Sequence, residues 1–267
     1  MCGGGGMNRY ERLNTLLALL ATGGSVEVDG AAHSLGVSAA TIRRDLDHLA
    51  GQQMLTRTRG GAVAHSVSYD LPLRYKTARQ TTAKQRIGAA AAALVDHGMV
   101  VGFTGGTTTT EVARALATRP DLQQSDGDPA VTVVTNALNI ANELTVRRNV
   151  KIVLTGGVAR PQSYELFGPL AERVLSELRI DMTFLGVEGL HPVEGAFAAH
   201  EGEADVNRLL ASRAARVIVV SDASKLGRTA FAHIWPLAGI DVLVTDDEAD
   251  PELLRPFADA GVELLLV

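Results

Sequence analysis

The chain has 267 residues, 46% hydrophobic and 4% aromatic, so it is long enough for two domains with mostly aliphatic cores. Its single cysteine, Cys2, excludes a disulfide framework and a cysteine-based zinc site. The formal net charge of −5 is uneven, because residues 1–86 carry 11 Lys and Arg against 6 Asp and Glu, whereas residues 87–267 carry 14 against 24.

This asymmetry predicts a small basic end attached to a larger acidic body. Basic ends attract polyanions such as DNA, although a chance scatter of solvated charges is the alternative. The apolar stretches reach only about eight residues, too short to span a bilayer. Residues 1–6, MCGGGG, lack the charged start and apolar core of a signal peptide, so we expect a disordered or tag-like N-terminus on a cytoplasmic protein with no membrane contact.

Residues 9–53 predict three helices. In the first, leucines recur at spacings of three and four, and Gly23-Gly24 ends the pattern. The segment VDGAAHSLGVSAATIRRDLDHLAGQQ then predicts helix, turn and helix, with a tight turn at Gly36 and Ser38 as the N-cap of the last helix.

The third helix is expected to be amphipathic. Its buried side carries Ile42, Leu46 and Leu49. Its opposite side carries Ala40, Arg43, Arg44 and Asp47. A helix with small residues at its start and outward arginines fits the DNA major groove, and we expect Asp47 to orient Arg43 through an i, i+4 pair. An ordinary surface helix with solvated arginines is the alternative.

The next segment, MLTRTRGGAVA, predicts two short strands joined at a Gly-Gly turn, with Arg57 and Arg59 available to the DNA backbone. Residues 7–64 therefore have the order of a winged helix-turn-helix domain. LGVSAATIRRDLDHLAGQQMLTRTRGGAV, residues 35–63, resembles the DNA-binding signature of the DeoR family of bacterial transcriptional regulators. The resemblance implies DNA contacts from Ser38, Ala40, Thr41, Arg43, Arg44, Arg57 and Arg59. In the supporting helix, Gly30, Ala31 and Ser34 depart from the family pattern, which usually has larger apolar residues at the last two positions.

Residues 65–80 form a polar, basic segment that we interpret as a linker, and an alanine-rich helix is predicted from there to Val95. The basic side chains in this connector could touch DNA, but we favour a role in solubility. Residues 81–267 then alternate apolar runs with helical patterns. The runs are MVVGF, VTVVT, VKIVL, MTFLGV, RVIVVS, DVLVT and VELLLV. Continuous apolar runs are typical of strands buried on both faces, so we predict an α/β domain with a mostly parallel sheet.

Most of these runs end in glycine or polar residues, which predicts a ligand crevice at the carboxyl edge of the sheet. GFTGGTTTTE, residues 102–111, is the strongest candidate, because glycines and threonines at a helix N-terminus favour a phosphate group. The spacing matches neither a nucleoside triphosphate loop nor a dinucleotide loop. The alternative is a glycine-rich turn with a threonine cap.

The segments FTGGTTTTEVARAL, VVTNALNIANEL, LTGGVARPQSYELFGPLAE, FLGVEGL and VSDASKLGRTAF resemble the DeoR-type effector domain, which is related to sugar-phosphate isomerases. The resemblance implies effector contacts from Thr104, Gly105, Gly106, Thr107, Thr108, Asn136, Gly156, Gly157 and Lys225, with Arg160 as a further candidate. The family commonly has an aspartate at the place of Thr104, so the preferred ligand can differ. Ala198 and Ala199 stand where the family has threonines, and we assign them no contact.

The sequence thus predicts a DNA-binding transcriptional regulator, a repressor of carbohydrate genes that is relieved by a phosphorylated sugar. A homo-oligomer, a dimer or tetramer, is expected because helix-turn-helix domains read paired half-sites. The histidines show no ligand spacing, so neither a metal nor a cofactor is expected. An isomerase-like enzyme is the alternative, but neither the candidate carboxylates nor Lys225 lies in a recognisable catalytic motif. Lys225 and Asp222 could equally form an ion pair. A protein-binding role for the winged helix is a third, weaker possibility.

Overall fold

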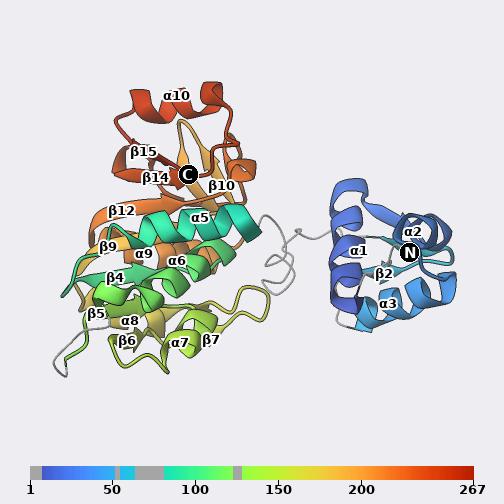
Figure 1. The fold of residues 1–267 in the computed structure, drawn as a ribbon, viewed down its shortest axis with the longest axis horizontal. Coiled ribbons are helices and arrows are strands. Elements are labelled where there is room, and N and C mark those ends of the chain that lie inside the picture. The colour runs from blue at the N-terminus through green and yellow to red at the C-terminus, as the bar shows by residue number, and fades with distance from the viewer. Residues whose placement is uncertain (1–7, 52–54, 64–80, 123–127) are drawn as a thin grey trace. The chain divides into compact units, whose positions relative to one another are not determined.

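The computed structural model describes residues 8–51, 55–63, 81–122 and 128–267, which belong to two compact units divided between Arg79 and Gln80 (Figure 1). Residues 1–6 and the predicted linker, residues 65–80, lie outside the described residues. No helix in the described part of the chain is long and apolar enough to cross a membrane.

The described residues of the N-terminal unit, 8–51 and 55–63, form three helices and a small sheet. Its elements are α1 (Arg9–Gly23), β1 (Ser25–Glu27), α2 (Val28–Leu35), α3 (Ala39–Gly51), β2 (Thr56–Arg57) and β3 (Gly61–Val63). The strands pair antiparallel in the order β1-β3-β2. The helices and the two wing strands match the sequence prediction, whereas β1 was not predicted because three residues between helices carry no periodic signal.

The helix ends follow the local sequence. Asn8 forms a capping box with Glu11 at the start of α1, and Gly24 ends that helix with a φ of 70°. Gly36 ends α2 with a φ of 65°, a backbone conformation that glycine adopts without a steric penalty. Ser38 Oγ accepts from the Thr41 amide at 3.2 Å, so Ser38 is the N-cap of α3 as predicted.

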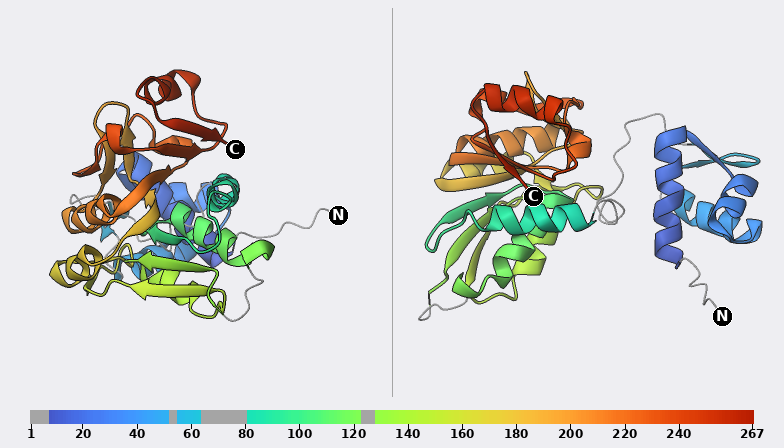
Figure 2. Two further views of the ribbon diagram at one scale, coloured as in Figure 1. Left: turned by 90° about the vertical axis from the view of Figure 1, so that its left-hand side faces the viewer. Right: turned by 45° about the horizontal axis from the view of Figure 1, so that its top comes forward.

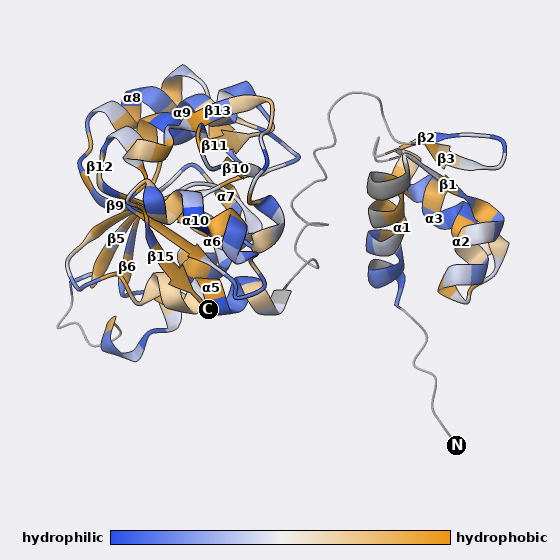
Figure 3. Cartoon of the chain, turned by 90° about the horizontal axis from the view of Figure 1, so that it is seen from above, coloured by the Kyte–Doolittle hydropathy of each residue, from blue (hydrophilic) through white to orange (hydrophobic). Residues whose placement is uncertain are grey.

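A leucine-rich core holds this unit together. Leu16, Ile42, Leu46 and Leu49 are each 0% exposed, and these residues join α1 to α3. The apolar stripes predicted for these helices are therefore the buried ones, and colouring by hydropathy shows apolar and polar sides along α3 (Figure 3).

The C-terminal unit is built on a parallel sheet with the strand order β15-β14-β12-β9-β4-β5-β6. Its strands are β4 (Val100–Phe103), β5 (Val131–Thr135), β6 (Val150–Leu154), β9 (Ile180–Gly186), β12 (Ala214–Val220), β14 (Val242–Thr245) and β15 (Glu263–Leu266). Each of the seven apolar runs in the sequence is one of these strands. The predicted α/β class and parallel sheet are confirmed.

Helices cover both faces of this sheet (Figures 1 and 2). The helices α5 (Thr81–Ala92), α6 (Thr107–Thr118) and α7 (Leu138–Leu144) contribute to one core cluster, and α8 (Pro169–Ser176), α9 (Glu201–Ser212) and α10 (Pro251–Asp259) contribute to clusters on the other side. In β12, Ile218 and Val220 belong to the first cluster and Val217 and Val219 to the second. Because successive side chains of a strand point to opposite faces, burial on both faces explains the continuous apolar runs.

Smaller elements complete the unit. The strands β10 (Gly189–His191), β11 (Gly195–Ala198) and β13 (Ala232–Trp235) form an antiparallel sheet, and β7 (Val158–Ala159) pairs with β8 (Leu166–Phe167). The 3-10 helices of the described residues are η1 (Pro120–Leu122), η2 (Ala223–Lys225) and η3 (Leu237–Gly239).

One predicted boundary was wrong. The alanine-rich helix ends at Ala92 and does not continue to Val95. The Arg119 guanidinium donates to the carbonyl oxygens of Ala92 at 2.5 Å and of Val95 at 2.6 Å. A side chain 24 or more residues away therefore satisfies carbonyls at the end of the helix, which no local sequence signal reveals.

Candidate DNA-binding and effector sites

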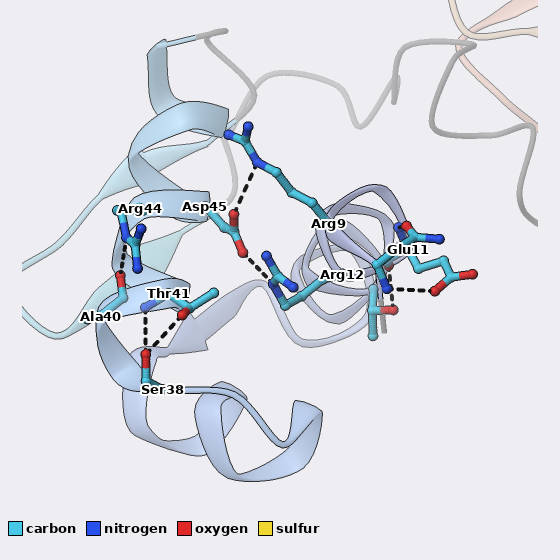
Figure 4. Close-up of polar contacts among 10 residues, drawn as sticks. Arg9, Glu11, Arg12, Ser38, Ala40, Thr41, Arg44 and Asp45 are labelled. Atoms are coloured by element: carbon cyan, nitrogen blue, oxygen red, sulfur yellow. Dashed lines mark hydrogen bonds and ion pairs between the residues drawn. The ribbon is translucent and has the colours of Figure 1, made fainter. Parts of the chain in front are cut away.

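The outward side of α3 is polar and open. Ala40, Arg43, Arg44 and Asp47 are all exposed, as the sequence predicts. Figure 4 shows Arg44, whose Nε donates to the Ala40 carbonyl at 3.3 Å, and Ser38, whose hydroxyl lies 2.9 Å from that of Thr41. Neither arginine head group pairs with a carboxylate among the described residues, so both can reach a polyanion.

The inward side of α3 is fixed to α1 by an ion pair that sequence reasoning missed. Asp45 is 3% exposed, and its carboxylate accepts from Arg12 Nε at 2.6 Å, with Arg9 Nε 3.6 Å away (Figure 4). A buried, paired carboxylate sets the orientation of α3 on the domain, because breaking such a pair leaves an uncompensated charge. The only sequence signal was an acid on the apolar side of the helical wheel.

The expected pairing of Asp47 with Arg43 was wrong. The Asp47 carboxylate accepts instead from Arg57 Nε at 2.7 Å, and Arg57 also donates to the Gly61 carbonyl. Since β2 packs against α3, the arginine of the wing is in reach of the helix. Arg57 thus joins the wing to α3, while Arg59 is exposed in the turn of the wing.

The glycine-rich loop connects β4 to α6. Gly106 is the N-cap of α6 with a φ of 137°, and its carbonyl accepts from the hydroxyls of Thr109 at 3.0 Å and Thr110 at 2.6 Å. Those two threonines shape the loop, whereas Thr107 and Thr108 lie in the first helical turn. First-turn amides have no partner within the helix, so this end can accept an anion.

Neighbouring strand ends meet at this loop. The Thr104 hydroxyl, 0% exposed, accepts from the Gly186 amide at 2.9 Å and so joins β4 to β9. Thr135 Oγ1 donates to the Phe103 carbonyl at 2.8 Å, which joins β5 to β4. Thr104 therefore acts as a buried cross-link between strands in this structure. The predicted gathering of polar strand ends at one edge of the sheet is what the structure contains.

Behind the loop lies a buried polar group that the sequence analysis did not identify. Glu165 is 5% exposed and its Oε2 accepts from Asn136 Nδ2 at 3.0 Å. A Cβ on Gly105 would lie 2.3 Å from Glu165 Cγ, so only glycine allows this approach. The preceding residue, Tyr164, has a φ of 61°, which is costly for a bulky side chain and marks a constrained segment.

Burial and the neighbouring charge of Glu203 raise the pKa of Glu165 to about 8. Glu203 itself is 6% exposed and accepts from Arg160 Nη1 at 3.0 Å. Arg160, a predicted effector contact, is therefore already bound to a carboxylate. Among the other predicted contacts, Gly157 has a φ of 119° and would clash with the Phe167 carbonyl if it carried a Cβ, so it also serves the packing of β8.

The possible Lys225–Asp222 pair does not form. Lys225 Nζ donates to Glu188 Oε1 at 2.7 Å, and Asp222 faces Lys84 Nζ of α5 at 3.7 Å. Lys84 and Asp222 have side chains only 7% and 5% exposed. The 3-10 helix after β12 explains the exchange, because its N-cap Asp222 turns toward α5 while Lys225 points to the segment after β9.

A family model described as the DeoR C terminal sensor domain matches residues 79–247, and one described as the DeoR-like helix-turn-helix domain matches residues 12–67. The chain belongs to the DeoR family. This DeoR-family protein is 34% identical to a putative aga operon transcriptional repressor from Escherichia coli O157:H7, over 96% of this chain and 93% of the relative. It is 30% identical to the glycerol-3-phosphate regulon repressor of Escherichia coli K12, over 97% of this chain and 100% of the relative.

Among solved structures, the full-length sorbitol operon regulator SorC from Klebsiella pneumoniae is 14% identical to this DeoR-family protein, with a TM-score of 0.40 over 92% of this chain and 98% of that chain. Such a distant likeness assigns no residue a role. The suspected family is confirmed by the two family models, which cover both halves of the chain.

Proposed function

We propose that this DeoR-family protein is a DNA-binding transcriptional repressor of carbohydrate genes, and that a phosphorylated sugar bound by its C-terminal unit relieves repression. The observation that carries the proposal is the outward side of α3 in a winged fold, where Arg43 and Arg44 are exposed and form no ion pair with the described residues. The names of the relatives, an aga operon repressor and a glycerol-3-phosphate regulon repressor, support the carbohydrate class.

In the proposed complex α3 enters the major groove. Arg43 and Arg44 contact base edges or phosphates, and Ser38, Ala40 and Thr41 at the start of the helix allow close approach. Arg59 meets the backbone from the wing. Arg57 has a shared role, because its Nε donates to the Asp47 carboxylate at 2.7 Å. The same proposal assigns residues 7–64 to the DNA-binding domain and residues 81–267 to the effector-sensing domain.

The effector occupies the carboxyl edge of the parallel sheet. Its phosphate binds at Gly105, Gly106, Thr107 and Thr108, where backbone amides and the dipole of α6 favour a negative charge. Asn136, Gly156, Gly157, Arg160 and Lys225 surround the rest of the molecule. Thr104 contributes through the loop that it cross-links to β9.

Helix α5 is the proposed route from the effector to DNA. It begins at Thr81, directly after the predicted linker, and packs against α6, whose N-terminus is the phosphate site. A Cβ on Gly88 of α5 would lie 2.7 Å from the Glu111 carbonyl carbon of α6, so the two helices are in backbone contact. Lys84 and Arg86 tie α5 to Asp222 and Asp247 at the ends of β12 and β14.

A regulatory role is favoured over an enzymatic one. The relatives named above are repressors. Two side chains that could serve an isomerase as acid or base, Lys225 and Glu188, form an ion pair with each other at 2.7 Å. An isomerase needs a base free to take a carbon-bound proton. The proposal includes a cytoplasmic location. It also includes a symmetric homo-oligomer, because a pair of winged helix-turn-helix domains matches a palindromic operator.

The test is fluorescence anisotropy of a labelled duplex from upstream of this protein's own gene, titrated with the full chain with and without a mixture of sugar phosphates. Arg44→Ala should weaken DNA binding by about 1–3 kcal/mol and leave effector binding unchanged. Gly105→Ala should do the reverse, since its methyl group meets Glu165. Arg148→Ala is the control for Arg44→Ala, because Arg148 is an exposed arginine of the C-terminal unit. Gly51→Ala is the control for Gly105→Ala, because a methyl group on Gly51 meets nothing within 4 Å.

Tight, salt-sensitive binding that the mixture weakens would support the proposal. Binding indifferent to every sugar phosphate would remove the effector class from it. If the full chain binds neither specific nor non-specific DNA, even at low salt, the isomerase-like alternative would be favoured.

A further inference from the structure

A buried polar cluster lies behind the phosphate loop. It is formed by Asn136, Arg160, Glu165, Glu203 and Asn207. Its members come from three separate segments of the chain: Asn136, the connection between β7 and β8, and α9. Glu165, just before β8, lies against Gly105 of the loop, and Asn136 follows β5. Glu203 and Asn207 lie one turn apart on α9, and Asn136 Nδ2 contacts Asn207 Oδ1 at 3.2 Å.

One buried acceptor of the cluster lacks a donor among the described residues. Asn136 is 0% exposed, and its Nδ2 donates to Glu165 while its Oδ1 has no partner among the described residues. A buried acceptor without a donor costs about 1–3 kcal/mol. The Leu166 carbonyl, 3.4 Å from Asn136 Nδ2, can only accept a hydrogen bond, so the amide nitrogen faces it and the unpaired atom is the oxygen.

The cluster also holds more carboxyl groups than cations among the described residues. Two carboxylates, Glu165 and Glu203, are buried in the cluster, and Arg160 is the cation that forms an ion pair with Glu203 at 3.0 Å. Desolvation and the charge of Glu203 favour the protonated form of Glu165 and raise its pKa. The cluster is therefore completed by a group that brings donors or positive charge.

Thr104 in the phosphate loop is neutral, so Glu165 is the carboxyl group available beside this loop to accept a hydrogen bond from a ligand. The Thr104 hydroxyl is 0% exposed, accepts from the Gly186 amide at 2.9 Å and donates to the Gly105 carbonyl at 3.3 Å, so it is engaged within the protein. Glu165 reaches the same loop from another segment, with its Oε1 2.6 Å from where a Cβ of Gly105 would stand.

We infer that Glu165, together with Asn136 Oδ1, is the specificity determinant of the effector site and receives a hydrogen-bond donor, a hydroxyl or an ammonium group, carried by the sugar next to its phosphate. The inference rests on the proposed function, since it names the recognition chemistry of the same site. Binding of the donor favours the ionised carboxylate, so effector binding releases the proton that the raised pKa keeps on Glu165. Glu203 and Arg160 are the charged neighbours that set this exchange.

The test is isothermal titration calorimetry of the full chain at pH 7 with glucose 6-phosphate, glucosamine 6-phosphate and glycerol 3-phosphate. Each titration is run in two buffers of different ionisation enthalpy, which yields the number of protons released. Glu165→Gln keeps the size of the side chain but removes its charge. Glu172→Gln, an exposed carboxylate on α8, is the matched control.

The wild-type chain should bind at least one probe with release of up to one proton. Glu165→Gln should weaken that binding about 10- to 100-fold and abolish the proton release, while Glu172→Gln changes neither. Inorganic phosphate should compete equally for wild type and Glu165→Gln, because the loop amides are retained. A preference for glucosamine 6-phosphate over glucose 6-phosphate would identify the donor as ammonium, and equal binding would identify it as hydroxyl.

Unchanged affinity and unchanged proton release in Glu165→Gln would overturn this inference and leave the proposed function intact. Failure of all three probes to bind the wild type would overturn this inference and remove the sugar-phosphate effector from the proposed function, whose DNA-binding part is tested separately by the anisotropy titration. Circular dichroism of Glu165→Gln confirms that the variant is folded before the comparison is made.

Discussion

Lys84 of α5 and Asp222 at the end of β12 form an ion pair in the interior of the C-terminal unit, with Nζ and Oδ2 separated by 3.7 Å and side chains 7% and 5% exposed. Two residues 138 positions apart thus connect the helix that follows the predicted linker to a strand end at the proposed ligand edge. The Asp222 carboxylate also accepts from the Ser224 amide at 3.2 Å, which fixes its position.

Breaking this pair from one side should be costly. Lys84→Met leaves the buried carboxylate without its lysine, and we expect a loss of about 3–5 kcal/mol in the free energy of unfolding. Lys84→Met combined with Asp222→Asn should lose less than the sum of the single variants. Urea denaturation of the four proteins in a double-mutant cycle measures the coupling. Strictly additive losses would show that the two groups do not interact.

Asp47 should restrain the affinity of the N-terminal unit for DNA. Its carboxylate is 64% exposed and holds Arg57, so Asp47→Ala removes a negative charge and frees an arginine. We expect non-specific DNA binding to tighten about threefold and the salt slope to steepen by about one phosphate contact. The free energy of unfolding should change by less than about 1 kcal/mol, because the pair is at the surface.

Anisotropy titrations at several salt concentrations measure this effect, with Asp29→Ala of α2 as a control of equal charge. Weaker binding by Asp47→Ala would instead mean that Asp47 positions Arg57 for its contact.

Gly30 offers a stabilising substitution. It lies within α2, its φ is not in the left-handed region, and an added Cβ meets nothing within 4 Å. Gly30→Ala should raise the free energy of unfolding of the N-terminal unit by about 0.5–1 kcal/mol through lower backbone entropy in the unfolded chain. Gly24→Ala is the matched control: it also meets no atom, but at a φ of 70° it should be destabilising. Thermal denaturation compares the two, and equal shifts would contradict the argument.

Stability should depend on pH through Glu165. Its pKa is about 8 in the folded protein and 4.5 in an unperturbed chain, so between these values the folded state binds the extra proton. The contribution is fully present below pH 4.5 and is lost as the pH rises through 8, at a rate of at most about 1.4 kcal/mol for each pH unit. Urea denaturation between about pH 5.5 and about pH 8.5, which covers most of this window, should show a flatter profile for Glu165→Gln than for Glu172→Gln. Parallel profiles would mean that Glu165 is ionised in the folded state.

The sequence by itself determined the elements. Leucine periodicity and glycine positions located α1 to α3, and seven continuous apolar runs became seven parallel strands. These signals are local, since burial on one side of a helix or both faces of a strand requires apolar residues at fixed spacing. The motifs around Thr107 and Arg44 were visible for the same reason.

Only the tertiary structure decided which polar side chains meet. Asp47 binds Arg57 rather than Arg43, Asp222 binds Lys84 rather than Lys225, and Glu165 lies against Gly105 although 60 residues separate them. Each pairing depends on how strands and helices distant in sequence are placed side by side. A carboxylate has no preference among cations that sequence spacing can reveal, because its partner is chosen by proximity in the folded chain and by the loss of water around both groups.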